Sequence, residues 1–114
     1  MKNQYTGDVG DYTKLGVLRG LEKAGFSIGL NWYLTPDEPE HSKTLTDGKH
    51  TSYLKCACDT PDVYLHSIIE KIGLSNNRTV ARLERAKLFK NALFWNKKLE
   101  AKSRNEWHLK ALKN

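Results

Sequence analysis

The stretch Phe26–Thr35, FSIGLNWYLT, is a nearly continuous apolar run rich in aromatic residues, and Pro36 ends it. Such a run is typical of a β-strand that is covered on both faces. A second run, Asn91–Leu99 (NALFWNKKL), also predicts a strand. The residues between the two runs have helical spacing, and strands separated by helices favour a parallel sheet with helices packed on its faces. We therefore predict a small α/β fold with few strands.

Helix start and stop signals complete this prediction. Asp11 can cap the first helix, which Gly25 ends, and Thr60-Pro61-Asp62 is a typical helix start. A capping box, Ser103–Glu106, begins a terminal helix. The predicted helices cover Asp11–Ala24, 47–54, Thr60–Gly73, Ser75–Leu88 and the residues after Ser103.

The length of 114 residues predicts one α/β domain, 1–114. A sheet of two strands would leave an edge with unpaired backbone groups. We expect a partner or a second subunit to cover that edge, so a homodimer is possible.

The sequence lacks the features of membrane and secreted proteins, and this indicates its cellular compartment. No apolar run approaches the roughly 18 residues of a membrane span, and no apolar stretch follows Lys2 as in a secretory signal. Cys56 and Cys58 stand too close together for a good disulfide, which favours a reducing compartment. We expect a cytoplasmic protein without a membrane partner, metal or cofactor.

Positive charge is concentrated in the second half of the chain. Residues 1–62 carry seven Lys or Arg and nine Asp or Glu, a balance of −2, whereas residues 63–114 carry twelve and four, a balance of +8. This asymmetry favours a polyanionic partner, nucleic acid or a nucleoprotein complex. The alternative is a solvated basic face.

Arg78, Arg82 and Arg85 recur at helical spacing and are predicted to share one helix face, as in proteins that contact a phosphate backbone. Trp107 could either stack on a base or belong to the core. The candidate partner-binding residues are Arg78, Arg82, Arg85, Lys87, Lys97, Lys98, Lys102, Arg104 and Trp107.

A polar cluster precedes the first helix. Asp8, Asp11 and Lys14 could bind a cation or a nucleotide phosphate, but the glycine-rich phosphate loop is incomplete. We prefer to interpret the two acids as turn and capping residues. No Ser or Cys has the surroundings of a covalent catalyst, so no catalytic residue is predicted.

The stretch Lys2–Arg19 (KNQYTGDVGDYTKLGVLR) resembles the start of a family of uncharacterised bacterial and phage proteins, which begin KNQYFGD and continue with Asp-Tyr and Lys-Tyr-Gly. The resemblance continues through Trp32–Asp37, Asp47–Lys49 and Tyr53–Leu54 and, more weakly, through Asn77–Arg78 and Asn91–Phe94. Members of that family are longer, and this chain resembles only their N-terminal half. The family is also distantly similar to ribosomal-RNA adenine methyltransferases, which would place Gly7, Asp8, Asp11 and Lys14 near a nucleotide or cofactor pocket.

The family's later Asp-Pro-Asp-Asn-Gly motif is missing from this chain. The resemblance therefore implies binding without chemistry: a phage- or mobile-element-encoded inhibitor of host defence, for example an anti-CRISPR protein. The alternative is a small enzyme, or enzyme subunit, that acts on a nucleotide or S-adenosylmethionine.

Overall fold

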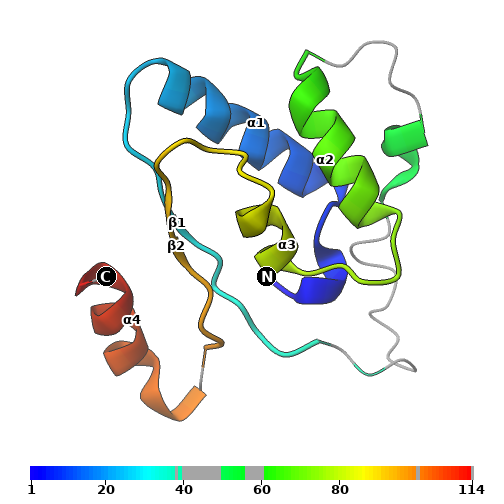
Figure 1. Ribbon diagram of the computed structural model, residues 1–114. Coiled ribbons are helices and arrows are strands. Elements are labelled where there is room, and N and C mark those ends of the chain that lie inside the picture. The colour runs from blue at the N-terminus through cyan, green and yellow to red at the C-terminus, as the bar shows by residue number, and fades with distance from the viewer. Residues whose placement is uncertain (38, 40–49, 56–60, 100, 114) are drawn as a thin grey trace.

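The computed structural model describes residues 1–37, 39, 50–55, 61–99 and 101–113. Within these residues the chain folds into four α-helices and a two-stranded parallel sheet (Figure 1), which confirms the predicted α/β class. The elements, with η for a 3-10 helix, are η1 (Asn3–Tyr5), α1 (Val9–Lys23), β1 (Gly29–Asn31), η2 (Ser52–Lys55), α2 (Val63–Gly73), α3 (Val80–Arg85), β2 (Leu93–Trp95), η3 (Ala101–Ser103) and α4 (Arg104–Lys113).

The two strands lie side by side in parallel, with Leu30 opposite Phe94 at the centre. Flanking backbone bonds extend the ladder, since the Leu93 amide donates to the Ile28 carbonyl at 3.0 Å and the Trp32 amide to the Trp95 carbonyl at 3.2 Å. The described residues between the two strands form η2, α2 and α3, which provide the long crossover that parallel strands require.

The strands are much shorter than the apolar runs that predicted them. Phe26 is 62% exposed and Tyr33 is 44% exposed, so the first run is not covered along its whole length. Tyr33 has a φ of 48°, which extended backbone does not allow, and β1 has ended before it. The apolar runs therefore predict the positions of both strands correctly, but the predicted strands are too long.

Helix boundaries also differ from the sequence prediction. The cap of α1 is Asp8, whose carboxylate accepts from the amides of Gly10 and Asp11, so the helix begins before Asp11. Asp62 caps α2 through the Leu65 amide, while Thr60 lies outside the described residues. Of the short helix predicted over 47–54, the described part contains only η2.

The predicted helix Ser75–Leu88 is reduced to α3 because polar groups bind the turn before it. Arg82 donates to the Ser75 hydroxyl at 2.6 Å and to the Asn77 carbonyl at 2.7 Å. The first helical amide, that of Val80, is bonded to the Asn3 side chain at 3.0 Å. After α3, Lys87 has a φ of 55°, which ends the helix.

The core lies where α1, α2 and α3 meet. Its most buried side chains include Leu15, Leu65, Ile69, Val80 and Leu83. The turn before α1 packs tightly against the end of α2: a Cβ atom added at Gly7 would lie 2.8 Å from the Gly73 Cα atom. This contact requires glycine, because Gly7 also has a φ of 87°.

We define the helical body as α1, α2 and α3 with the described turns beside them, 75–79 and 86–88 included. Arg19 connects the two longest helices of this body. Its Nε donates to the Asp62 carboxylate at 2.6 Å, its NH1 to the Leu88 carbonyl, and its guanidinium lies 5.0 Å from the centre of the Tyr64 ring. Burial alone would raise the pKa of Asp62, but hydrogen bonds from Arg19 and the Leu65 amide, with the positive charge of Arg19, hold it below its ordinary value.

The remaining helix, α4, stands at the other end of the molecule from α2 (Figure 1). Only Trp107 of α4 is buried. The molecule is flat, with extents of 45 × 43 × 18 Å. None of the described helices has the length and apolar character needed to span a bilayer.

Candidate nucleic-acid interface and an apolar pocket

The three arginines predicted to share one helix face do not form one in the structure. Arg78 lies before α3, and its Nε donates to the Thr6 carbonyl at 2.6 Å. Burial lowers the pKa of the Arg78 guanidinium, and the negative charges of Asp8 and Asp11 oppose that shift. Arg82 is bonded to the turn at 75–77, so these two side chains hold the fold together. Arg85 and Lys87 are exposed.

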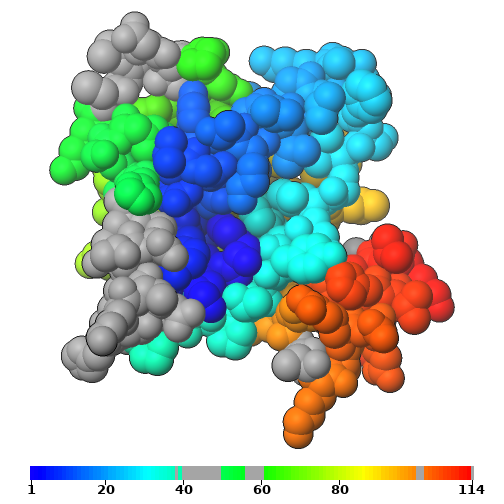
Figure 2. Space-filling view, turned by 180° about the vertical axis from the view of Figure 1, so that it is seen from behind, coloured from blue at the N-terminus to red at the C-terminus, as the bar shows by residue number. Residues whose placement is uncertain are grey.

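Exposed cations gather instead at the C-terminal end. We define the basic lobe as residues 97–99 together with η3 and α4. Its described part carries six exposed Lys or Arg side chains and one acid, Glu106: the cations are Lys97, Lys98, Lys102, Arg104, Lys110 and Lys113. Figure 2 shows the lobe (orange to red) projecting from the edge of the molecule.

Two shallow hollows lie on this lobe. Lys97, Lys98 and Lys110 line the first, of about 280 Å³, whose other walls are Trp95, Ser103, Glu106 and Trp107. Residues 102–106, including Lys102 and Arg104, line the second, of about 350 Å³. Cations outnumber acids in both hollows, since Glu106 is the one acid in each, and this balance suits an anionic group such as a backbone phosphate.

Trp107 is part of the packing rather than of the surface. It is only 6% exposed, its indole N–H donates to the Lys97 carbonyl at 3.0 Å, and its ring lies edge-on to Trp95. A base cannot stack on it unless it moves. Its hydrogen bond to Lys97 holds α4 against the segment after β2 that carries Lys97 and Lys98.

Lys110 was not among the candidates predicted from the sequence, although it lines the first hollow with Lys97 and Lys98. It follows Trp107 by three residues, so both lie on the same side of a helix. The sequence shows the spacing of Trp107 and Lys110. Only the structure shows that the side of α4 that carries both residues faces Lys97 and Lys98.

The polar cluster near the N-terminus is largely engaged with the backbone, in agreement with the capping interpretation. Asp8 caps α1, and the buried Asp11 accepts from the Gly7 amide at 3.0 Å and pairs with Lys14 at 3.0 Å. The Tyr53 hydroxyl donates to the Gly7 carbonyl at 3.1 Å, and burial raises its pKa. These groups therefore stabilise the turn before α1.

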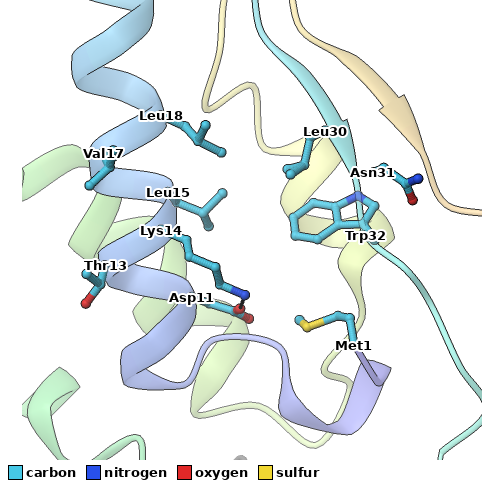
Figure 3. A pocket seen from close by; sticks show the side chains of 10 residues that line it. All are labelled: Met1, Asp11, Thr13, Lys14, Leu15, Val17, Leu18, Leu30, Asn31 and Trp32. Carbon is cyan, nitrogen blue, oxygen red and sulfur yellow. Dashed lines mark ion pairs between the residues drawn. The ribbon is translucent and has the colours of Figure 1, made fainter. Parts of the chain in front are cut away.

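Asp11 and Lys14 also line a pocket between α1 and β1, whose volume is about 440 Å³ (Figure 3). Figure 3 shows Leu15, Leu18, Leu30 and Trp32 around it, with the ion pair of Asp11 and Lys14 at one end. The pocket is mainly apolar, and Asp8 does not line it. The three predicted nucleotide-pocket residues are thus not brought to one surface.

Metal binding has no candidate in the described part of the chain, where no group of three or more His, Cys, Asp or Glu side chains comes together. Cys56 and Cys58 lie outside the described residues.

No protein family, curated protein or solved structure matches this chain. The resemblance of Lys2–Arg19 to bacterial and phage proteins therefore stays a prediction.

Proposed function

We propose that this protein is a non-catalytic binding protein of the cytoplasm whose basic lobe contacts the phosphate backbone of nucleic acid, either free or in a nucleoprotein complex. The observation that carries the proposal is the convergence of Lys97, Lys98 and Lys110 on one hollow, beside a second hollow rimmed by Lys102 and Arg104. Action against a host defence complex would be one use of such binding, and it rests on the family resemblance alone.

The exposure of these cations supports the proposal. A lysine or arginine that contacts a phosphate releases counterions, which is the main source of sequence-independent affinity. The six cations of the basic lobe are all exposed, while Arg19, Arg78 and Arg82 are hydrogen-bonded within the protein. The lobe can therefore bind without giving up interactions that stabilise the fold.

The buried position of Trp107 favours duplex nucleic acid over single strands. Proteins that bind single strands combine a basic groove with aromatic rings on which bases stack. Here Trp107 is buried, and Trp95 is partly buried against it. Phosphates, which both forms present, would be the main contact, and a duplex presents them at higher charge density.

Fluorescence anisotropy with a labelled duplex, over a range of salt concentrations, tests this proposal. With five or six phosphate contacts, the logarithm of the association constant should fall with the logarithm of salt concentration with a slope of about −4.5 to −5.4. An affinity that does not change with salt would contradict it. A single strand of the same length should bind more weakly with a smaller slope.

A charge reversal locates the surface. Lys98→Glu in the basic lobe should weaken binding by roughly tenfold, since it removes one phosphate contact and adds a repulsive charge. Lys71→Glu is the matched control, because Lys71 is exposed on α2, at the other end of the molecule (Figure 1). An equal loss in both variants would assign binding to net charge alone.

A second candidate function, a small enzyme or subunit for a nucleotide or S-adenosylmethionine, has one observation in its favour: Asp11 and Lys14 line the 440 Å³ pocket. Its mainly apolar walls offer few groups for phosphates. A thermal-shift assay with nucleotides and S-adenosylmethionine checks it, since a ligand at a hundred times its Kd should add about 2.7 kcal/mol of stability. No shift with any of them would remove this candidate.

A further inference from the structure

The outer edge of β1 itself has no backbone partner in the described part of the chain; directly after β1, Met1 occupies this side, where it is bonded to Tyr33 and Thr35. The ladder with β2 uses the Ile28 carbonyl, both backbone groups of Leu30 and the Trp32 amide. In a parallel ladder the alternate residues point their backbone groups the other way. The N–H and C=O groups of Gly29 and Asn31 therefore face outward, and no described residue provides a backbone partner for them.

The surroundings of this edge leave room for another strand. Gly29 is exposed, and a Cβ atom added there would meet no atom within 4 Å. Figure 2 shows the region around β1 (cyan) open on the flat face, between α1 (blue) and α4 (orange to red). Four backbone groups on an accessible edge, none of them with a backbone partner among the described residues, form a template for strand addition.

Apolar side chains flank the edge on both sides. Leu30 and Asn31 line the pocket next to α1, where Val17 is 60% exposed. They also line a second hollow, of about 510 Å³, next to α4, where Leu93 and Leu112 are exposed. The strand itself, Gly-Leu-Asn, carries no charge. A partner strand at this edge would therefore be covered by apolar groups on both of its faces.

We propose that a second copy of this chain occupies the edge, with the two β1 strands antiparallel about a two-fold axis through Leu30. In this register Gly29 of each copy lies opposite Asn31 of the other, and each such pair exchanges two N–H···O bonds. All four outward groups of each strand are then satisfied, giving one four-stranded sheet.

The side chains fit the same symmetry. Cross-strand partners lie on the same face of a sheet, so the Asn31 side chain of one copy meets the position where Gly29 of the other has no side chain. The two Leu30 side chains meet at the axis, where paired residues approach most closely. A contact that uses the same patch on both subunits closes as a dimer and adds no further copies.

The size of the face is sufficient for such a dimer. A standard interface buries about 800 Å² per partner, which is about a tenth of the 7841 Å² surface of this chain. The flat face that contains β1 measures about 45 × 43 Å. The face is therefore large enough to contain a patch of standard size around β1.

Sedimentation equilibrium of the full chain at micromolar concentrations tests the proposal, with an expected mass of twice 13.1 kDa. Gly29→Pro removes an outward donor without touching the ladder with β2, and it should weaken self-association by at least about tenfold, because each dimer loses two hydrogen bonds. Gly29→Ala keeps the N–H, and its Cβ would meet no atom of its own chain, so it should weaken self-association less than Gly29→Pro does. A monomeric wild type, or a dimer that Gly29→Pro leaves unchanged, overturns the proposal.

Amide hydrogen exchange of the wild type at two protein concentrations tests the same interface without a variant, in case Gly29→Pro does not fold. The amides of Gly29 and Asn31 should exchange at least about tenfold more slowly in concentrated than in dilute solution. The amide of Phe94 is the internal control, because in the ladder it faces the opposite edge of the sheet. Equal rates for Gly29 and Asn31 at both concentrations would overturn the proposed interface.

Discussion

The helical body and the basic lobe are both rich in cations, yet they use them differently. In the body, Arg19, Arg78 and Arg82 donate to carboxylate, carbonyl and hydroxyl oxygens of the chain itself. In the basic lobe, cations such as Lys98 and Lys110 stand exposed around hollows. The number of positive charges therefore does not locate a binding surface, because the positions of hydrogen-bond acceptors decide which cations stabilise the fold.

The largest expected effect concerns the body. Gly7→Ala forces a side chain against the Gly73 backbone at a positive φ, and it should lower the free energy of unfolding by about 3 kcal/mol. Chemical denaturation measures this. Gly20→Ala is the control, since no atom lies within 4 Å of its added Cβ and alanine favours a helix; it should stabilise the protein by about 0.5–1 kcal/mol. A destabilised Gly20→Ala variant would contradict the described packing of α1.

Arg19→Met tests whether a cation of the helical body contributes more to stability than a cation of the basic lobe. It leaves the partly buried Asp62 carboxylate without its ion pair and frees the Leu88 carbonyl, so the free energy of unfolding should fall by about 2–3 kcal/mol. Lys98→Met in the basic lobe should change it by less than about 0.5 kcal/mol. Thermal and denaturant unfolding of both variants check this. Equal losses would break the distinction between structural and exposed cations.

Acid should weaken the body through Asp62. Its pKa is lower in the folded chain than in the unfolded chain, so its contribution is complete above about pH 5 and is lost as the pH falls through the unfolded-state and then the folded-state pKa. We expect the unfolding free energy of the wild type to fall more steeply between about pH 5 and pH 2 than that of Asp62→Asn. Parallel pH profiles would show that Arg19 does not stabilise the Asp62 carboxylate.

The smallest expected effect concerns Lys87, one of the predicted partner-binding residues. Its φ of 55° is unfavourable for lysine and acceptable for glycine, so Lys87→Gly should raise the free energy of unfolding by about 0.5–1 kcal/mol. Nucleic-acid affinity should change by less than about twofold, because Lys87 lies outside the basic lobe. A tenfold loss of affinity would extend the binding surface to the end of α3.

Sequence reasoning located the strands and most helices because apolar periodicity is a local property. It overestimated both strands, since nothing local shows that Phe26 and Tyr33 reach solvent. Arg78 was predicted on a helix face from its spacing to Arg82 and Arg85. Spacing cannot show that the Arg78 side chain donates to the Thr6 carbonyl, 72 residues away in the chain. Sequence reasoning also could not find Lys110, whose neighbours depend on how Trp107 packs.

Asp8 and Asp11 were interpreted from the sequence as turn and capping residues, and the structure agrees. Capping is decided within a few residues of the chain, so the two acids could be assigned to a helix start from sequence alone, although the cap proved to be Asp8. The mainly apolar character of the pocket next to Asp11 could not be predicted, because β1 contributes its opposite wall.

One measurement tests the central claim, that cations of the basic lobe and not those of the body bind a polyanion. It compares the salt dependence of duplex binding for two triple variants of equal charge: Lys97→Ala/Lys98→Ala/Lys110→Ala in the lobe, and Lys71→Ala/Arg85→Ala/Lys87→Ala in the body. The slope against salt should become less steep by about 2–3 in the lobe variant and stay at the wild-type value in the body variant. The same change of slope in both variants would contradict the account.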